Sequence, residues 1–168
     1  KHIEYLGGFP VVLKDAHGGG WKNVAVCYNY DELFTAYNGS GLLTMVLQEY
    51  IKWDDYVRCM ALGQSEIYVA KYDPNARKYL HHGQSDEMHA RIVKDSLTLV
   101  RALGYDMTTL EWAIKDGVPY AIEFMNPAPD MDIYSTGMDY HRWCVTHMAD
   151  MCIALAKDPK PQQAPYRA

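Results

Sequence analysis

The chain has 168 residues, which suits one domain or two small lobes. Hydrophobic residues make up 49% and charged residues 22%, which excludes a wholly disordered chain. The net charge of −5 argues against a broad surface for nucleic acid or membranes. With scattered cysteines and no apolar run of about 18 residues, we expect a cytoplasmic protein with neither a nucleic-acid nor a membrane partner.

The first third of the chain predicts a small lobe. A strand over 11–14 ends in Lys14, and the loop after it contains Gly18, Gly19 and Gly20. A cation fixed on a strand beside exposed backbone N–H groups can hold a nucleotide's phosphates. A hairpin with a solvated lysine is the plainer alternative. The partner strand is expected over 23–27, a helix over 31–38 with Leu33, Phe34 and Tyr37 inward, and a strand over 46–51.

The rest of the chain predicts a larger lobe. Strands are expected over 56–62, 66–72, 108–114 and 120–124, and helices over 86–103 and 137–156. The inward residues are expected to be Val93, Leu97 and Val100 on the first helix, and Cys144, Met148, Met151, Cys152 and Leu155 on the second. This order predicts an α+β fold with mostly antiparallel sheets, divided into lobes 1–51 and 52–157 with a frayed tail 158–168.

Two carboxylates in an apolar context are the clearest chemical signal. Glu111 and Glu123 lie on the two arms of the last predicted hairpin, where we expect them to be direct cross-strand neighbours. Like charges in that position are destabilising unless a cation lies between them, and Asn126 offers a third hard oxygen just beyond. The pattern favours a divalent-ion site over a solvent-facing polar stripe.

Cations and polar residues elsewhere suggest a nucleotide site. Arg58 interrupts an apolar strand, and we expect it to lie close to Lys71 across a hairpin, either facing an anion or paired with carboxylates. Gln48 or Glu49 could reach a base edge, and Asp54 or Asp55 could accept hydrogen bonds from ribose hydroxyls, although each alone is an ordinary surface residue. His81 and His82 are expected in a solvated loop. A second set, His141, Cys144 and His147, is too spread along its helix for zinc.

Taken in order, these features resemble the ATP-grasp superfamily over most of the chain, from about Leu6 to Ala156. The resemblance implies a nucleotide cleft between the two lobes, with ATP and Mg²⁺ (or Mn²⁺) as cofactors. It implies phosphate contacts for Lys14, Gly18, Gly19 and Gly20, an adenine-framing segment in Gln48, Glu49 and Ile51, and ribose contacts for Asp54 or Asp55. It also implies catalytic roles near the phosphates for Arg58 and Lys71, and metal ligation by Glu111, Glu123 and Asn126.

The implied activity is that of a carboxylate–amine ligase. Such an enzyme forms an acyl phosphate from a small-molecule carboxylate and passes the acyl group to an amine or thiol. The family usually places one residue between its last two ligands, whereas two stand between Glu123 and Asn126, and a bulge could absorb the extra residue. The resemblance also implies an N-terminal domain that this sequence does not contain, so we expect that domain as a partner and an isolated piece that could be inactive. Two alternatives stay open: a non-catalytic ATP-binding or regulatory module, and an interaction domain with a face rich in tyrosine and tryptophan. A homo-oligomer also stays open.

Overall fold

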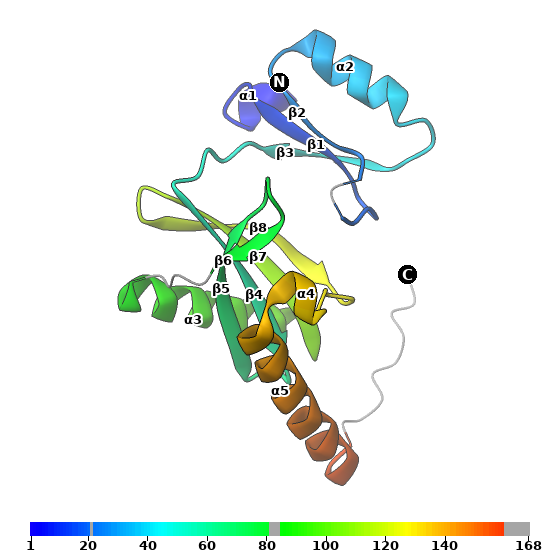
Figure 1. The fold of residues 1–168 in the computed structure, drawn as a ribbon. Coiled ribbons are helices and arrows are strands. Elements are labelled where there is room, and N and C mark those ends of the chain that lie inside the picture. The colour runs from blue at the N-terminus through cyan, green and yellow to red at the C-terminus, as the bar shows by residue number, and fades with distance from the viewer. Residues whose placement is uncertain (21, 81–84, 160–168) are drawn as a thin grey trace. The chain divides into compact units, whose positions relative to one another are not determined.

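The computed structural model describes residues 1–20, 22–80 and 85–159 of the chain (Figure 1). The chain divides into two compact units, Lys1–Lys52 and Trp53–Ala168. Both units combine antiparallel sheets with helices, so the predicted α+β class is confirmed. In the described residues, no helix is both long and apolar enough to cross a membrane.

Unit 1 is a three-stranded antiparallel sheet with two helices (Figure 1). Its strand order is β2-β1-β3. Its elements are α1 (His2–Tyr5), β1 (Val11–Asp15), β2 (Val24–Cys27), α2 (Tyr30–Gly39) and β3 (Met45–Glu49). The third strand ends two residues earlier than predicted, so Ile51 lies in the segment after it.

The core of unit 1 lies on one face of its sheet, where Val11 and Leu13 of β1 are buried. Leu33 of α2 packs against this core as predicted. The prediction that Phe34 and Tyr37 also point inward is wrong, because their side chains are 57% and 55% exposed. The helix packs along the line of Leu33 and Ala36 instead, and this spacing turns the two aromatic rings outward.

Unit 2 is a five-stranded antiparallel sheet of order β6-β5-β4-β7-β8. Its strands are β4 (Asp55–Leu62), β5 (Glu66–Asp73), β6 (Lys78–Leu80), β7 (Met107–Lys115) and β8 (Val118–Asn126). Its helices are α3 (Asp86–Leu103), α4 (Ile133–Thr136) and α5 (Met138–Lys157). The short elements α1, α4 and β6 were not predicted, since none is long enough to carry a hydrophobic period.

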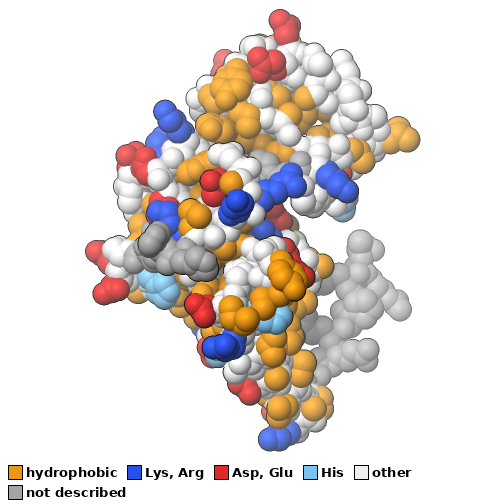
Figure 2. Space-filling view, viewed as in Figure 1, with side chains coloured by type: hydrophobic (Ala, Val, Ile, Leu, Met, Phe, Trp, Pro, Cys, Tyr) orange, Lys and Arg blue, Asp and Glu red, His pale blue; other side chains and the backbone are white. Residues whose placement is uncertain are grey.

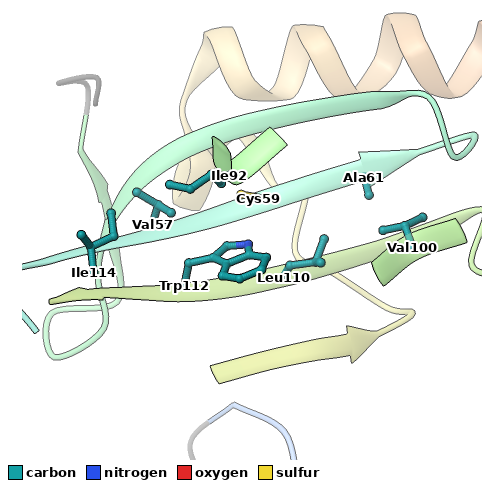
Figure 3. Packing of buried hydrophobic residues seen from close by; sticks show 8 residues of the cluster. All are labelled: Val57, Cys59, Ala61, Ile92, Val100, Leu110, Trp112 and Ile114. Carbon is teal, nitrogen blue, oxygen red and sulfur yellow. The ribbon is translucent and has the colours of Figure 1, made fainter. Parts of the chain in front are cut away.

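One face of this sheet, here called the α3 face, packs against α3. Side chains at alternate positions of β4 and β7 meet the helix in this layer (Figure 3). Val100 of α3 is buried as predicted, but the other two buried residues are Ile92 and Ser96, one position before the predicted Val93 and Leu97, which are only half-buried. Ser96 is inside because its hydroxyl accepts a hydrogen bond of 3.0 Å from the indole N–H of Trp112.

The opposite face, here called the α5 face, packs against α5. Met60 and Leu62 of β4 are buried there beside Tyr140 and Cys144 of the helix. The prediction that Cys152 is also buried is wrong, because its thiol is exposed. In the second half of the helix, Met148 and Met151 are half-buried and pack against this core as predicted. Other hydrophobic side chains run along the outer surface of the helix (Figure 2).

Candidate functional site

The two predicted metal ligands are cross-strand partners. β7 and β8 are joined by Asp116 and Gly117, whose φ angles of 50° and 72° fit a tight two-residue turn. Next to the turn, Ile114 pairs with Pro119, one residue away from the predicted register. A register shift then brings Glu111 opposite Glu123, so the predicted pair is confirmed although a bulge creates it.

A second irregularity places Asn126 on the same face. Thr109 pairs with Asn126, so the strand between Glu123 and Asn126 is one residue longer than the facing stretch from Thr109 to Glu111. Thr109 and Glu111 share a face because they are two residues apart. The bulge therefore absorbs the extra residue and turns Asn126 toward the side of the sheet that carries both carboxylates.

Glu111 is held inside the sheet by two neighbours from β4. Only 7% of this residue is exposed. Its Oε2 accepts a hydrogen bond of 2.6 Å from the Tyr56 hydroxyl, and its Oε1 lies 3.7 Å from Arg58 Nε. Burial, followed by the nearby charge of Glu111, raises the pKa of Tyr56 well above its usual value, so the phenol stays protonated and donates a hydrogen bond to the carboxylate.

Arg58 points to the α5 face and lies among polar and aromatic side chains. It is directly opposite Glu111, and its guanidinium lies 5.4 Å from the centre of the Tyr72 ring. A terminal guanidinium nitrogen lies 3.5 Å from Thr109 Oγ1. The sequence left two interpretations of Arg58 open, facing an anion or pairing with a carboxylate. The structure pairs it with a hairpin carboxylate, Glu111, which is also a predicted metal ligand.

Lys71 lies on the other side of the same sheet. The prediction that it forms one cationic patch with Arg58 is wrong, because Lys71 pairs with Val57 and Arg58 pairs with Ala70. With Leu62 paired to Glu66, Arg58 and Lys71 are one position out of register, and an offset of one residue places two side chains on opposite faces. Lys71 instead makes a 3.1 Å ion pair with Asp55.

The two predicted ribose contacts have structural partners within unit 2. Asp55 accepts a hydrogen bond from the Tyr56 backbone N–H in addition to its ion pair with Lys71. Asp54 accepts one of 2.9 Å from the backbone N–H of Asp116 in the β7–β8 turn. Both carboxylates therefore help to fix the start of β4.

The predicted residues of unit 1 divide between the two faces of its sheet. Lys14 and Gln48 share the face opposite the core, because Gln48 pairs with Val12 and Lys14 pairs with Val46. Val26 and Val46 are 37% and 39% exposed on this face. The alternation of β3 turns Glu49 to the opposite face, and only its backbone can contribute to the predicted base-binding edge.

Two of the three loop glycines are required by the backbone. Gly20 has a φ of +63°, which L-residues rarely adopt. A Cβ on Gly18 would lie only 2.9 Å from the Cβ of Asp15, whereas a Cβ on Gly19 would meet nothing within 4 Å. The loop therefore approaches the end of β1 closely and then turns sharply.

Histidine and cysteine residues do not form a metal centre in the described part of the chain. No group of three or more histidine, cysteine or acidic residues is arranged to hold an ion there. His141 Nδ1 lies 2.9 Å from the carbonyl oxygen of Met131, which gives it a structural partner. The predicted loop residues His81 and His82 lie outside the described residues.

Comparisons with known proteins bear on the fold. No protein-family model matches this chain. It is 29% identical over 142 residues to D-alanine–D-alanine ligase A of Bacillus cereus, a match that covers 74% of this chain and 46% of the relative. The ATP complex of D-alanine–D-alanine ligase from Bacillus anthracis aligns with 95% of this chain and 56% of its own, at a TM-score of 0.73 and 21% identity. A nucleotide complex of biotin carboxylase from Campylobacter jejuni aligns with 86% of this chain and 38% of its own, at a TM-score of 0.65 and 20% identity.

These likenesses establish the fold. The chain has the fold of these ligase structures, which is the ATP-grasp fold that its sequence features predict. It spans about half the length of the curated D-alanine–D-alanine ligases that it matches.

Proposed function

We propose that this chain is the nucleotide- and metal-binding part of an ATP-dependent ligase. The ligase would form an acyl phosphate from a small-molecule carboxylate and pass the acyl group to an amine or thiol. The observation that carries the proposal is the convergence of Glu111, Glu123 and Asn126 on one face of an ATP-grasp sheet. The similarity to D-alanine–D-alanine ligases, and an ATP complex of one of them, support it.

The three side chains fit Mg²⁺ by their chemistry. Magnesium prefers hard oxygens, takes few protein ligands and leaves its remaining positions to water and phosphate oxygens. Two carboxylates and an amide oxygen match that preference. A bound cation would also offset the repulsion between the like charges of Glu111 and Glu123, which face each other across the hairpin. When bound, the ion would neutralise charge that develops on the phosphates.

The residues of unit 1 would hold the nucleotide. Lys14 would contact the phosphates from a strand, and the backbone N–H groups of the loop at Gly18–Gly20 would cover them. The exposed valines beside Gln48 offer an apolar surface to a base. The backbone from Glu49 to Ile51 would contact the edge of the base, with Asp54 or Asp55 near the ribose.

The chemistry needs charge and orientation rather than a protein nucleophile. A substrate carboxylate oxygen attacks the γ-phosphorus and ADP leaves, and the amine nitrogen then attacks the acyl carbon and expels phosphate. Arg58, buried beside Glu111 on the α5 face, would steady the transferring group. Lys71, whose ion pair with Asp55 lies on the α3 face, has the weaker claim to a catalytic role.

Oxygen transfer tests the proposal directly. Because one carboxylate oxygen bridges carbon and phosphorus in the acyl phosphate, an ¹⁸O-labelled carboxylate must pass one label to inorganic phosphate. We would supply the full-length protein with ATP, Mg²⁺ and labelled D-alanine, followed by other amino acids, and analyse the phosphate by mass spectrometry. Singly labelled phosphate supports the ligase, whereas binding of Mg-ATP with no label transfer from any substrate would favour the non-catalytic module.

A further inference from the structure

We infer that Tyr56 is a positioning residue for Glu111, which it orients so that one carboxylate oxygen is left for the metal. The inference rests on the proposed metal site. Its starting point is the 2.6 Å hydrogen bond from the Tyr56 hydroxyl to Glu111 Oε2, between two side chains that are 4% and 7% exposed.

The strand register explains how Tyr56 reaches the carboxylate. Tyr56 pairs with Ala113, and Glu111 is two residues further along the same face of β7. The small Ala113 side chain leaves room for the ring to extend diagonally across the strands. A larger side chain at position 113 would occupy the space through which the phenol reaches Glu111.

The phenol ring is itself held by other aromatic rings. Its centre lies 5.2 Å from that of Trp53 at an interplanar angle of 63°, and 6.3 Å from that of Tyr72 at 43°. These edge-on and tilted contacts, together with nearly complete burial, leave the ring little rotational freedom. The position of the hydroxyl is therefore set before any ligand arrives.

The two oxygens of Glu111 have different surroundings. Oε2 is the acceptor for Tyr56, whereas Oε1 has Arg58 Nε at 3.7 Å, which is beyond hydrogen-bond distance. A carboxylate fixed through one oxygen presents the other in a defined direction. Groups that orient a metal ligand in this way commonly contribute about 10- to 100-fold to metal affinity or activity.

The test replaces Tyr56 by Phe in the full-length protein, which removes the hydroxyl and keeps the ring. Mn²⁺, detected by electron paramagnetic resonance, would be titrated into the protein with a non-hydrolysable ATP analogue. We expect Mn²⁺ affinity to fall about 10- to 100-fold, while the affinity for the analogue without metal stays unchanged. Tyr120→Phe is the matched control, because it makes the same change on β8 at an exposed side chain.

A double-mutant cycle separates positioning from a general loss of structure. If Tyr56 acts through Glu111, Tyr56→Phe should weaken Mn²⁺ binding no further once Glu111→Gln is present. Additive effects of the two changes, or unchanged Mn²⁺ affinity in Tyr56→Phe, would overturn the inference and leave the proposed function intact. Absence of metal-dependent nucleotide binding in the wild-type protein would instead overturn the proposed function, and the inference with it.

Discussion

The two cross-strand carboxylates should differ in what they contribute to folding, although both are proposed to bind the same ion. The perturbation is a pair of matched substitutions, Glu111→Gln and Glu123→Gln. Glu111 is buried, accepts a hydrogen bond from Tyr56 and lies beside Arg58, whose side chain is 14% exposed. Glu123 occupies the facing position on β8 and is exposed.

The structure sets the expected magnitudes. Removing the charge of Glu111 weakens a charge-assisted hydrogen bond and leaves Arg58 with a neutral neighbour, which should cost about 1.5–3 kcal/mol. For a chain of this length that corresponds to a fall in Tm of about 3–12 °C. Glu123→Gln should change stability by no more than about 0.5 kcal/mol, since it also relieves the like-charge pair.

The assay combines urea unfolding without metal with Mn²⁺ titration in the presence of an ATP analogue. Both variants should bind Mn²⁺ and the nucleotide together more weakly than the wild type, but only Glu111→Gln should unfold earlier. An equal loss of stability in Glu123→Gln would refute the reasoning, because the two sites would then have the same structural role. Undiminished Mn²⁺ binding in both variants would remove the metal assignment.

Three further predictions test other parts of the structure. Gly20→Ala forces an L-residue to a φ of +63° and should destabilise unit 1 by about 1–2 kcal/mol in urea unfolding, with Gly19→Ala as the neutral control. Ser96→Ala leaves the indole N–H of Trp112 without its 3.0 Å acceptor and should cost about 1–3 kcal/mol, whereas a loss near zero would mean that the N–H finds another partner. Burial raises the pKa of the Cys59 thiol to about 12. The thiol ionises at lower pH in the unfolded chain than in the folded one. The stability that the buried thiol contributes should therefore be complete below the usual thiol pKa and fall as the pH rises toward about 12. Cys59→Ala should remove that part of the pH dependence.

Much of the fold could be predicted because the longer helices and strands have clear turn and capping residues at their ends. The Asp116-Gly117 turn fixes the last hairpin, and Ser85 and Gly104 cap the two ends of α3. The predictions that failed depended on single-residue registers. Lys71 was assigned to the face of Arg58, but pairing of Leu62 with Glu66 puts it opposite Val57, one position away from Arg58 and therefore on the other face.

The candidate site was only partly predictable for a related reason. The pairing of Glu111 with Glu123 was predicted from a register that is one residue off at the turn, and a bulge restores the pair, although no residue type in the sequence marks where a bulge falls. The role of Tyr56 was missed because it contacts Glu111 on a neighbouring strand, and the two residues are 55 positions apart in the chain. The spacing of Tyr56 and Arg58 was a usable signal. Two positions apart on one strand, they place a hydrogen-bond donor and a cation on the same face, which indicates a buried carboxylate on the next strand.

The arrangement around Glu111 joins folding and binding in one side chain. A buried carboxylate is costly unless hydrogen bonds and a positive charge compensate it, and Tyr56 and Arg58 supply both. The same contacts hold Glu111 in a fixed orientation opposite the exposed Glu123 across the hairpin. A site built from one fixed and one exposed carboxylate needs little reorganisation on the buried side. The fixed carboxylate should therefore determine where the metal lies.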